Sequence, residues 1–152
     1  MKKILIIFAI FFIDRFVKLY LINLQTNGTD VDFYIFSFLN IFLVWNTGIG
    51  FGLVSLEANI FYHFLTVVII LINTGLIYLL YKSKGLYSYL IAIIIGGSLG
   101  NLFDRMYYYA VPDFIDFHIG DNHWFVFNVA DVFITLGIAL LIAEELLTKK
   151  KF

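Results

Sequence analysis

The sequence predicts an all-α membrane protein with four transmembrane helices and a small outward-facing β-rich cradle. Three observations lead to this fold class. Of the 152 residues, 62% are hydrophobic and 14% are charged, against about 25% charged in a typical soluble domain. Four apolar runs are long enough to cross a bilayer. The lysines and arginines would also gather on one side of such a four-span chain.

The four predicted spans cover about residues 4–24, 59–81, 86–106 and 126–147. The first run follows two lysines and resembles a secretion signal, but no small-residue cleavage site follows it. We therefore expect a retained helix and one compact domain over residues 1–152. The chain contains no cysteine, which excludes disulfides and thiol catalysis.

The basic residues predict the orientation of the chain. Segments 25–57 and 107–125 contain no lysine or arginine. By the positive-inside rule, both termini and the 82–85 turn are cytoplasmic, and the two segments without basic residues face outward. Seven of the ten basic residues lie on the cytoplasmic side in this arrangement: Lys2, Lys3, Lys82, Lys84, Lys149, Lys150 and Lys151.

Residues 33–53 form a fifth uncharged run that hydropathy alone would count as a span. Inserting this run would move Lys82 and Lys84 to the outer side, against the charge pattern. Its aromatic and β-branched residues favour strands, and the glycines of "NTGIGFG" interrupt it. The β-rich cradle is therefore placed at about residues 25–57, at the outer membrane surface.

Polar and ionisable side chains occur inside or beside the predicted spans. Such a group costs about 2.5–3.5 kcal/mol at the centre of a span, so it usually faces protein and has a function. Residues three or four positions apart share one helix face. The set comprises Asp14, Arg15 and Lys18 in the first run, Asn101, Asp104 and Arg105 in the third, and Asn128 and Asp131 at the start of the fourth.

Each of these groups also has an ordinary structural explanation. Asn128 and Asp131 could be a helix start, with Asn as N-cap and an acid in the first turn. Asp14 and Lys18 could be a structural ion pair. A carboxylate between the last two helices is usually solvated, which is the expectation for Asp116 and Asp121. The spacing of His63, His118 and His123 does not suit a metal site.

Convergence favours a catalytic role. The outer ends of the third and fourth helices and the segment between them bring Asp104, Asp113 and Asp131 to one membrane depth. With Asp14, the four acids exceed the three nearby basic residues by one charge, so one proton would neutralise the set. Two carboxylates that share a proton can split an amide with water. A proton- or ion-coupled transporter and a non-enzymatic interaction protein remain alternatives.

Five motifs in order resemble the lipoprotein signal peptidases, which are the type II signal peptidases of bacteria. They are "DRFVK", "NTGIGFG", "GGSLGNLFDR", "VPDFIDF" and "WFVFNVAD", and they extend across nearly the whole chain. The sequence departs from the family pattern at Pro112, where a β-branched residue is usual, and at Gly50, where alanine is more common. Neither change affects an acid.

The resemblance implies a membrane aspartic endopeptidase domain over residues 1–152 in the bacterial inner membrane, with its active site near the extracytoplasmic face. It implies cleavage of prolipoproteins before a diacylglyceryl-modified cysteine, contact with membrane lipid, and inhibition by globomycin-type peptides. No metal, organic cofactor or nucleic acid is expected. The catalytic pair implied is Asp113 and Asp131, and the supporting residues implied are Asp14, Asn46, Asn101, Asp104, Arg105 and Asn128.

Overall fold

The computed structural model describes residues 1–48, 60–120 and 122–149. Four long helices occupy the four predicted spans, and their ends lie within three residues of the expected boundaries. Residues 126 and 127, which we had assigned to the fourth span, belong to a strand. The helices are α1 (Lys2–Thr26), α2 (Ile60–Lys82), α3 (Gly85–Tyr108) and α4 (Val129–Lys149).

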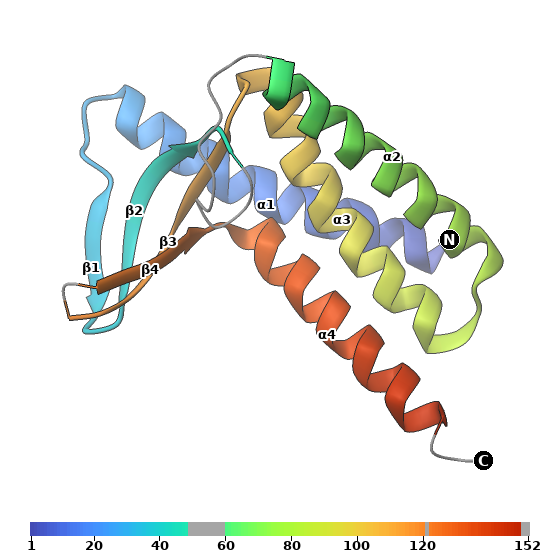
Figure 1. The fold of residues 1–152 in the computed structure, drawn as a ribbon. Coiled ribbons are helices and arrows are strands. Elements are labelled where there is room, and N and C mark those ends of the chain that lie inside the picture. Colours follow the sequence, from blue (N-terminus) through green and yellow to red (C-terminus); the bar gives the residue numbers. More distant parts are fainter. Residues whose placement is uncertain (49–59, 121, 150–152) are drawn as a thin grey trace.

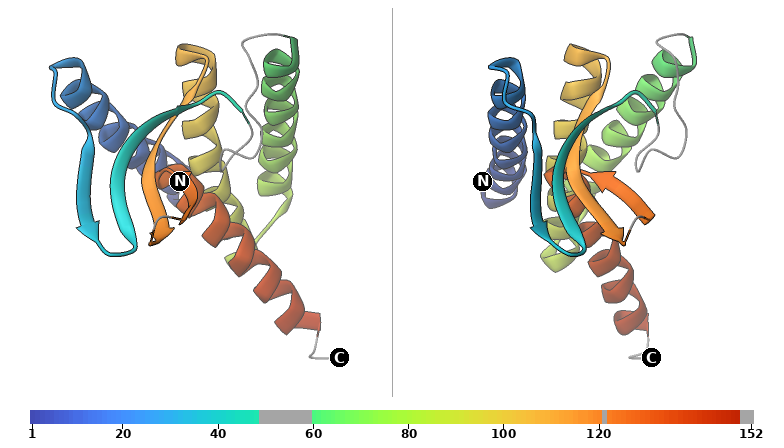
Figure 2. Two further views of the ribbon diagram at one scale, coloured as in Figure 1. Left: turned by 60° about the vertical axis from the view of Figure 1, so that its left-hand side comes forward. Right: turned by 90° about the vertical axis from the view of Figure 1, so that its left-hand side faces the viewer.

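Helix α3 lies at the centre of the helical bundle, with α1 and α2 on opposite sides of it (Figure 2). Glycines let the neighbouring helices approach α3 closely. A Cβ at Gly97 would lie 2.5 Å from the carbonyl oxygen of Ala130 on α4. Helix α2 is joined to α3 by a hydrogen bond of 2.8 Å from Asn73 Nδ2 to Ser98 Oγ.

The strands form one antiparallel sheet in the order β1-β2-β3-β4. The sheet lies at one end of the helices, whereas the N-terminus and the α2–α3 turn lie toward the other end (Figure 1). Strands β1 and β2 confirm the expected strands between residues 33 and 46, and residues 49–53 of that run lie outside the described part. The strands are β1 (Asp32–Phe36), β2 (Leu39–Asn46), β3 (Val111–Ile119) and β4 (Asn122–Phe127).

Strands β3 and β4 were not expected, because the sequence predicted a loop over residues 107–125. The error has a physical cause in β3, which shows no apolar–polar alternation. Residues 111–114 are all buried. One face of β3 packs on α1, and the other face lies against the start of α4. A strand that is covered on both faces lacks the period-2 pattern of a half-exposed strand.

Pro112 lies inside β3, directly opposite Trp45 of β2. A proline in a strand removes a backbone donor and is tolerated where no second neighbour needs that donor. Strand β4 pairs with β3 only from Ile115 onward. At position 112 the strand therefore has one neighbour, and the proline does not interrupt the β3–β4 pairing.

One face of the sheet packs on the C-terminal end of α1. Leu21, Val31, Leu43 and Phe114 form the buried cluster at this junction. This contact fixes the position of β3 relative to the helices. As a result Asp113, which directly precedes Phe114, lies over the start of α4.

Two of the described helices are apolar and long enough to cross a membrane. They are Tyr62–Lys82 within α2 and Gly85–Tyr108, which is α3. Helix α1 carries Asp14 at its middle and Arg15 and Lys18 just beyond it, and all three are buried. These charges interrupt the apolar sequence of α1 but face the protein interior.

Candidate active site

Asp113 projects from β3 toward the first turn of α4 and is 2% exposed. Both of its carboxylate oxygens accept hydrogen bonds. Asn46 Nδ2 donates to Oδ2 at 2.8 Å, and Asn128 Nδ2 donates to Oδ1 at 2.5 Å. Burial, with a further contribution from the charge of Asp131, raises the pKa of Asp113 from 3.8 to about 6. This carboxyl group can therefore hold a proton at a pH where an exposed aspartate has lost it.

Asp131 lies in the first turn of α4, three residues after Asn128. The two residues form a reciprocal cap. The Asp131 N–H donates to Asn128 Oδ1 at 3.0 Å, and the Asn128 N–H donates to Asp131 Oδ2 at 3.2 Å. The structural explanation of this pair as a helix start is correct. The same cap, however, also turns the Asn128 amide toward Asp113.

Asn128 therefore connects the two acids. Its Nδ2 donates to Asp113 while its Oδ1 accepts from the backbone of Asp131. The side chain of Asn128 is fully buried, so no water competes for these two bonds. Asn128 thus bonds the Asp113 carboxylate through its side chain and the Asp131 carboxylate through its backbone N–H.

A second asparagine connects Asp131 to the charges of α1. Asn101 Nδ2 donates to Asp131 Oδ1 at 2.8 Å, and Lys18 Nζ donates to Asn101 Oδ1 at 2.9 Å. Lys18 also lies 2.7 Å from a carboxylate oxygen of Asp14 and 2.7 Å from one of Asp104. All three charged side chains are completely buried. Lys18 thus links α1 to α3 and, through Asn101, to the acid of α4.

Asp14 has a further role at the start of α4. Its Oδ1 accepts the backbone N–H of Ala130 at 2.9 Å. A carboxylate at a helix N-terminus satisfies a free N–H group and interacts favourably with the helix dipole. Asp14 therefore fixes the turn of α4 that carries Asp131. The Asp14–Lys18 pair is structural, as expected, but it contacts the site directly.

Asp104 and Arg105 connect α3 to other elements. Asp104 forms an ion pair with Arg15 of α1. Arg105 donates to the carbonyl of Gly48 at 3.0 Å, just beyond β2. Tyr62 of α2 donates to the Arg105 carbonyl at 2.9 Å, so Arg105 joins three elements beside the site.

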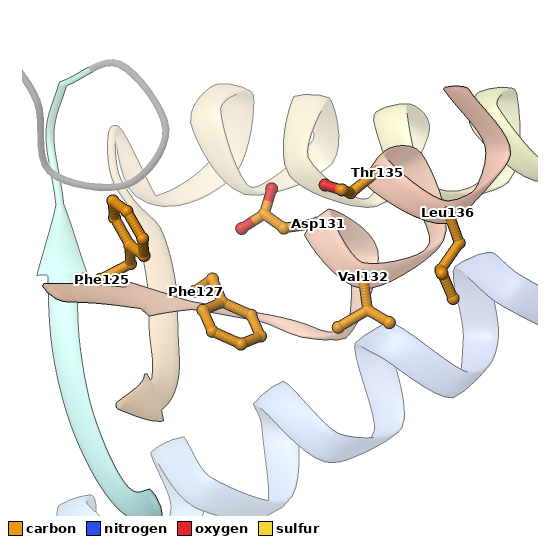
Figure 3. Close-up of a pocket in the computed structure, with 6 residues that line it drawn as sticks. All are labelled: Phe125, Phe127, Asp131, Val132, Thr135 and Leu136. Atoms are coloured by element: carbon orange, nitrogen blue, oxygen red, sulfur yellow. The ribbon is translucent and has the colours of Figure 1, made fainter. Parts of the chain in front are cut away.

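A cavity of about 270 Å³ opens beside Asp131. Figure 3 shows the Asp131 carboxylate at this cavity, with aromatic rings of β4 on the strand side and aliphatic side chains on the α4 side. Apart from Asp131 and Thr135, the lining is apolar. An apolar chain could therefore lie here against the acid. The lining residues are Phe125, Phe127, Asp131, Val132, Thr135 and Leu136.

The structure brings together all eight residues that the sequence nominated. Sequence reasoning missed Tyr62 and the apolar lining of the cavity, because no motif or spacing marks them. It was also wrong about Asp116, which is buried at 1% exposure and not solvated. Asp121 and Gly50 lie outside the described residues. Within the described ranges, no group of three or more His, Cys, Asp or Glu side chains is placed to hold a metal ion.

Comparisons with known proteins agree on one family. The family model described as signal peptidase (SPase) II matches residues 6–147. A lipoprotein signal peptidase of Pelagibacter ubique (strain HTCC1062) is 47% identical over 149 residues, which cover 98% of this chain and 90% of the relative. A lipoprotein signal peptidase of Anaplasma phagocytophilum (strain HZ) is 40% identical over 146 residues, covering 94% and 90%.

Solved structures show the same fold. A bacterial membrane enzyme determined by the in meso method at 2.3 Å resolution superposes with a TM-score of 0.79 at 29% identity, covering 99% of this chain and 90% of that one. A second bacterial membrane enzyme, determined by the same method at 1.9 Å, gives a TM-score of 0.77 at 30% identity, with coverages of 95% and 92%. The similarity includes both the helices and the sheet.

Proposed function

Because the chain belongs to the signal peptidase II family and is a membrane protease, we propose that Asp113 and Asp131 form its catalytic pair. The substrate class is prolipoproteins, and the bond cut is the one before a diacylglyceryl-modified cysteine. The single observation that carries this proposal is that Asn128 donates hydrogen bonds to both carboxylates, from its side chain to Asp113 and from its backbone N–H to Asp131. Nothing in the comparisons supports a transporter.

In the proposed mechanism, the carboxyl groups of Asp113 and Asp131 share one proton. The ionised acid removes a proton from a water molecule held between them, and this water attacks the scissile carbonyl. The protonated acid gives its proton to the carbonyl oxygen as the tetrahedral intermediate forms. When this intermediate collapses, the acid that took the proton from water passes it to the leaving amine, and the other acid recovers a proton from a hydroxyl of the intermediate. The raised pKa of Asp113 supports a shared proton near neutral pH.

The remaining polar residues position the pair. Asn46 and Asn128 hold Asp113, while Asn101 and the Asn128 backbone hold Asp131. Asp14 and Asp104, bound by Lys18, fix α1 against α3 and α4. The apolar cavity beside Asp131 would receive an apolar part of the substrate, and a globomycin-type peptide would compete for the same space.

The proposed topology has four crossings of the inner membrane of a bacterium, with both termini cytoplasmic. The sheet and the catalytic pair would then lie at the extracytoplasmic surface, where water reaches the scissile bond while the lipid remains in the bilayer. Two features support this placement. The described lysines 2, 3, 82 and 84 lie at the ends of the helices away from the sheet (Figure 1), and segments 25–57 and 107–125 have no basic residue.

The decisive experiment replaces each acid with its isosteric amide. Asp113→Asn and Asp131→Asn should each insert and fold, yet lower the rate of prolipoprotein cleavage at least about 100-fold, because general acid–base catalysis is lost. Cleavage is measured with purified enzyme in detergent and a diacylglyceryl-modified substrate. Asp30→Asn, at an exposed position outside the site, is the matched control. Substantial cleavage by either variant would remove that residue from the catalytic pair.

A further inference from the structure

The sheet carries a second polar cluster on the face opposite Asp113. Side chains alternate between the two faces along a strand, so Asp116, three residues after Asp113, points away from the catalytic face. Phe114, on the same face as Asp116, packs against α1. The cluster around Asp116 is therefore separate from the active site.

Asp116 is a buried carboxylate with one oxygen unused. Its Oδ2 lies 2.7 Å from Nδ1 of His123, whereas its Oδ1 is buried and has no hydrogen-bond partner among the described residues. Asn40 lies directly across from Asp116 on β2. The Oδ1 atom of Asn40 is also buried without a partner in the described part of the chain. A buried acceptor without a donor is unfavourable, so a ligand that supplies one would be bound favourably.

Asp116 and Asn40 both line one cavity of about 360 Å³. All four strands contribute to the lining, so the cavity is part of the sheet and does not belong to a single loop. The polar atoms that lack partners are acceptors, which means that a ligand must supply donors. The lining residues are Asp32, Asn40, Phe42, Asp116, His123 and Val126.

The charge balance indicates that the ligand is a cation. Asp32 and Asp116 both contribute negative charge, and His123 is the only described basic group paired with Asp116. The sequence has no lysine or arginine in segments 25–57 and 107–125, so neither segment can supply a lysine or arginine counter-charge. In the described ranges no set of three His, Cys, Asp or Glu side chains is arranged for a metal ion. An organic ammonium group, which carries several N–H donors, fits this cavity better.

We propose that this cavity binds the primary ammonium group of an ethanolamine lipid headgroup. The lipid source rests on the topology proposed above, which puts the sheet at the membrane surface. Every residue of β1 is exposed, including Phe33, Tyr34, Ile35 and Phe36, and aromatic side chains are typical of the membrane–water interface. A substrate peptide at Asp113 would run along the opposite face, which disfavours a peptide lysine.

The test compares two lipids that differ only in the three methyl groups that replace the N–H donors of the headgroup. Full-length protein in detergent is titrated with phosphatidylethanolamine or with phosphatidylcholine of the same acyl chains, and retained lipid is measured by native mass spectrometry. Trimethylammonium has the same charge but cannot donate hydrogen bonds. The wild type should bind phosphatidylethanolamine about tenfold more tightly, the value of one or two charged hydrogen bonds.

Asp116→Asn should reduce this preference to less than about twofold. Asn40→Ala provides an independent variant that leaves the buried carboxylate in place and should also weaken the preference. Asp30→Asn removes the same charge from an exposed position outside the cavity and should keep the preference. Prolipoprotein cleavage in detergent reports folding and should persist in all three variants, because the cavity lies on the other face of the sheet.

Three results would overturn the proposal. The first is equal binding of the two lipids to the wild type. The second is an unchanged preference in both Asp116→Asn and Asn40→Ala. The third is a requirement of Asp116 for binding N-acetyl-lysine amide while both lipids bind equally, which would assign the cavity to a peptide. None of these results depends on whether Asp113 and Asp131 are catalytic.

Discussion

At the scale of single residues, Asp113 makes the stability of the protein depend on pH. Its pKa is raised in the folded state from 3.8 to about 6, so the folded protein binds more protons than the unfolded chain between these values. Linkage then requires the free energy of unfolding to fall as pH rises through this window. The free energy of unfolding falls by at most about 3 kcal/mol, and it stays at this lower value above pH 6.

Replacing Asp113 with asparagine removes this titration. We therefore expect the midpoint of thermal unfolding of Asp113→Asn, relative to wild type, to rise between pH 4 and pH 7. The measurement is thermal unfolding in detergent at both pH values. The substitution also alters the hydrogen bonds of residue 113, and this effect is the same at both pH values. The titration of the carboxyl group is therefore measured by how the difference in unfolding midpoint between variant and wild type changes from pH 4 to pH 7. A difference that is the same at pH 4 and pH 7 would contradict the raised pKa.

Asn128 combines two functions that a substitution can separate. Serine at this position can still cap α4 by accepting the Asp131 N–H, but its hydroxyl is too short to reach Asp113. Asn128→Ser should therefore lower kcat and cost about 1–3 kcal/mol of stability, because the buried Asp113 oxygen loses its donor. Asn128→Ala should lose about 1 kcal/mol more, because the cap is gone as well.

Steady-state cleavage and thermal unfolding of both variants check this separation. The expected split is a fall in kcat with little change in KM, since Asn128 positions the acids and does not bind the substrate's apolar part. Full activity in Asn128→Ser would show that the hydrogen bond to Asp113 is not needed for the reaction. Equal instability of the two variants would show that the cap does not contribute to stability, because only Asn128→Ser retains it.

At the scale of helices and strands, the close approach of α3 and α4 depends on Gly97. An added Cβ would lie 2.5 Å from the backbone carbonyl of Ala130, in the turn of α4 that carries Asp131. A backbone atom in a packed helix cannot move aside cheaply. Gly97→Ala should therefore destabilise the protein by about 1–3 kcal/mol and reduce cleavage, because α4 must shift away from α3.

Gly75 of α2 is the matched control, since a Cβ there meets nothing within 4 Å. Gly75→Ala should be neutral or slightly stabilising, as alanine favours helix by up to about 1 kcal/mol. Thermal unfolding and cleavage of both variants are compared in one detergent. Equal tolerance of alanine at the two positions would mean that α3 and α4 are not held at this distance.

The helices could be predicted from the sequence because each is an apolar run of nearly membrane length. Strands β1 and β2 could be predicted from aromatic and β-branched content. Strand β3 could not, since burial on both faces removes the alternation that identifies a strand, and Pro112 argued against one. Helix α4 begins after Asn128 because Asn128 is its N-cap, as its spacing of three residues from Asp131 suggested.

The residues of the candidate site could be predicted from the sequence, but their hydrogen-bond and ion-pair partners could not. Helical spacing places Asn101 near Asp104, and Asn128 near Asp131. The hydrogen bond from Ala130 to Asp14 depends on how α1 crosses α4, and local spacing carries no information on that crossing. The same holds for Arg105, whose contact with Gly48 depends on where the chain leaves β2. Tertiary packing, and not local pattern, decides these partners.

At the scale of the whole molecule, the distribution of charge makes the proposed topology testable. The described lysines 2, 3, 82 and 84 lie away from the sheet, whereas segments 25–57 and 107–125 have none. Retaining lysines on the cytoplasmic side is the main determinant of orientation in short loops. Four crossings are therefore expected to leave the α2–α3 turn inside and the sheet outside.

Single cysteines can test this arrangement directly, because the natural sequence has none. Asp30→Cys, at an exposed position before β1, should react with a membrane-impermeant maleimide in intact bacterial spheroplasts. Ser83→Cys, in the turn between α2 and α3, should react only after the membrane is permeabilised. Cleavage of prolipoprotein confirms that each variant is folded and inserted. Labelling of Ser83→Cys in sealed spheroplasts would show that the orientation or the number of crossings differs from the proposed one. The catalytic pair would then not be placed at the outer surface.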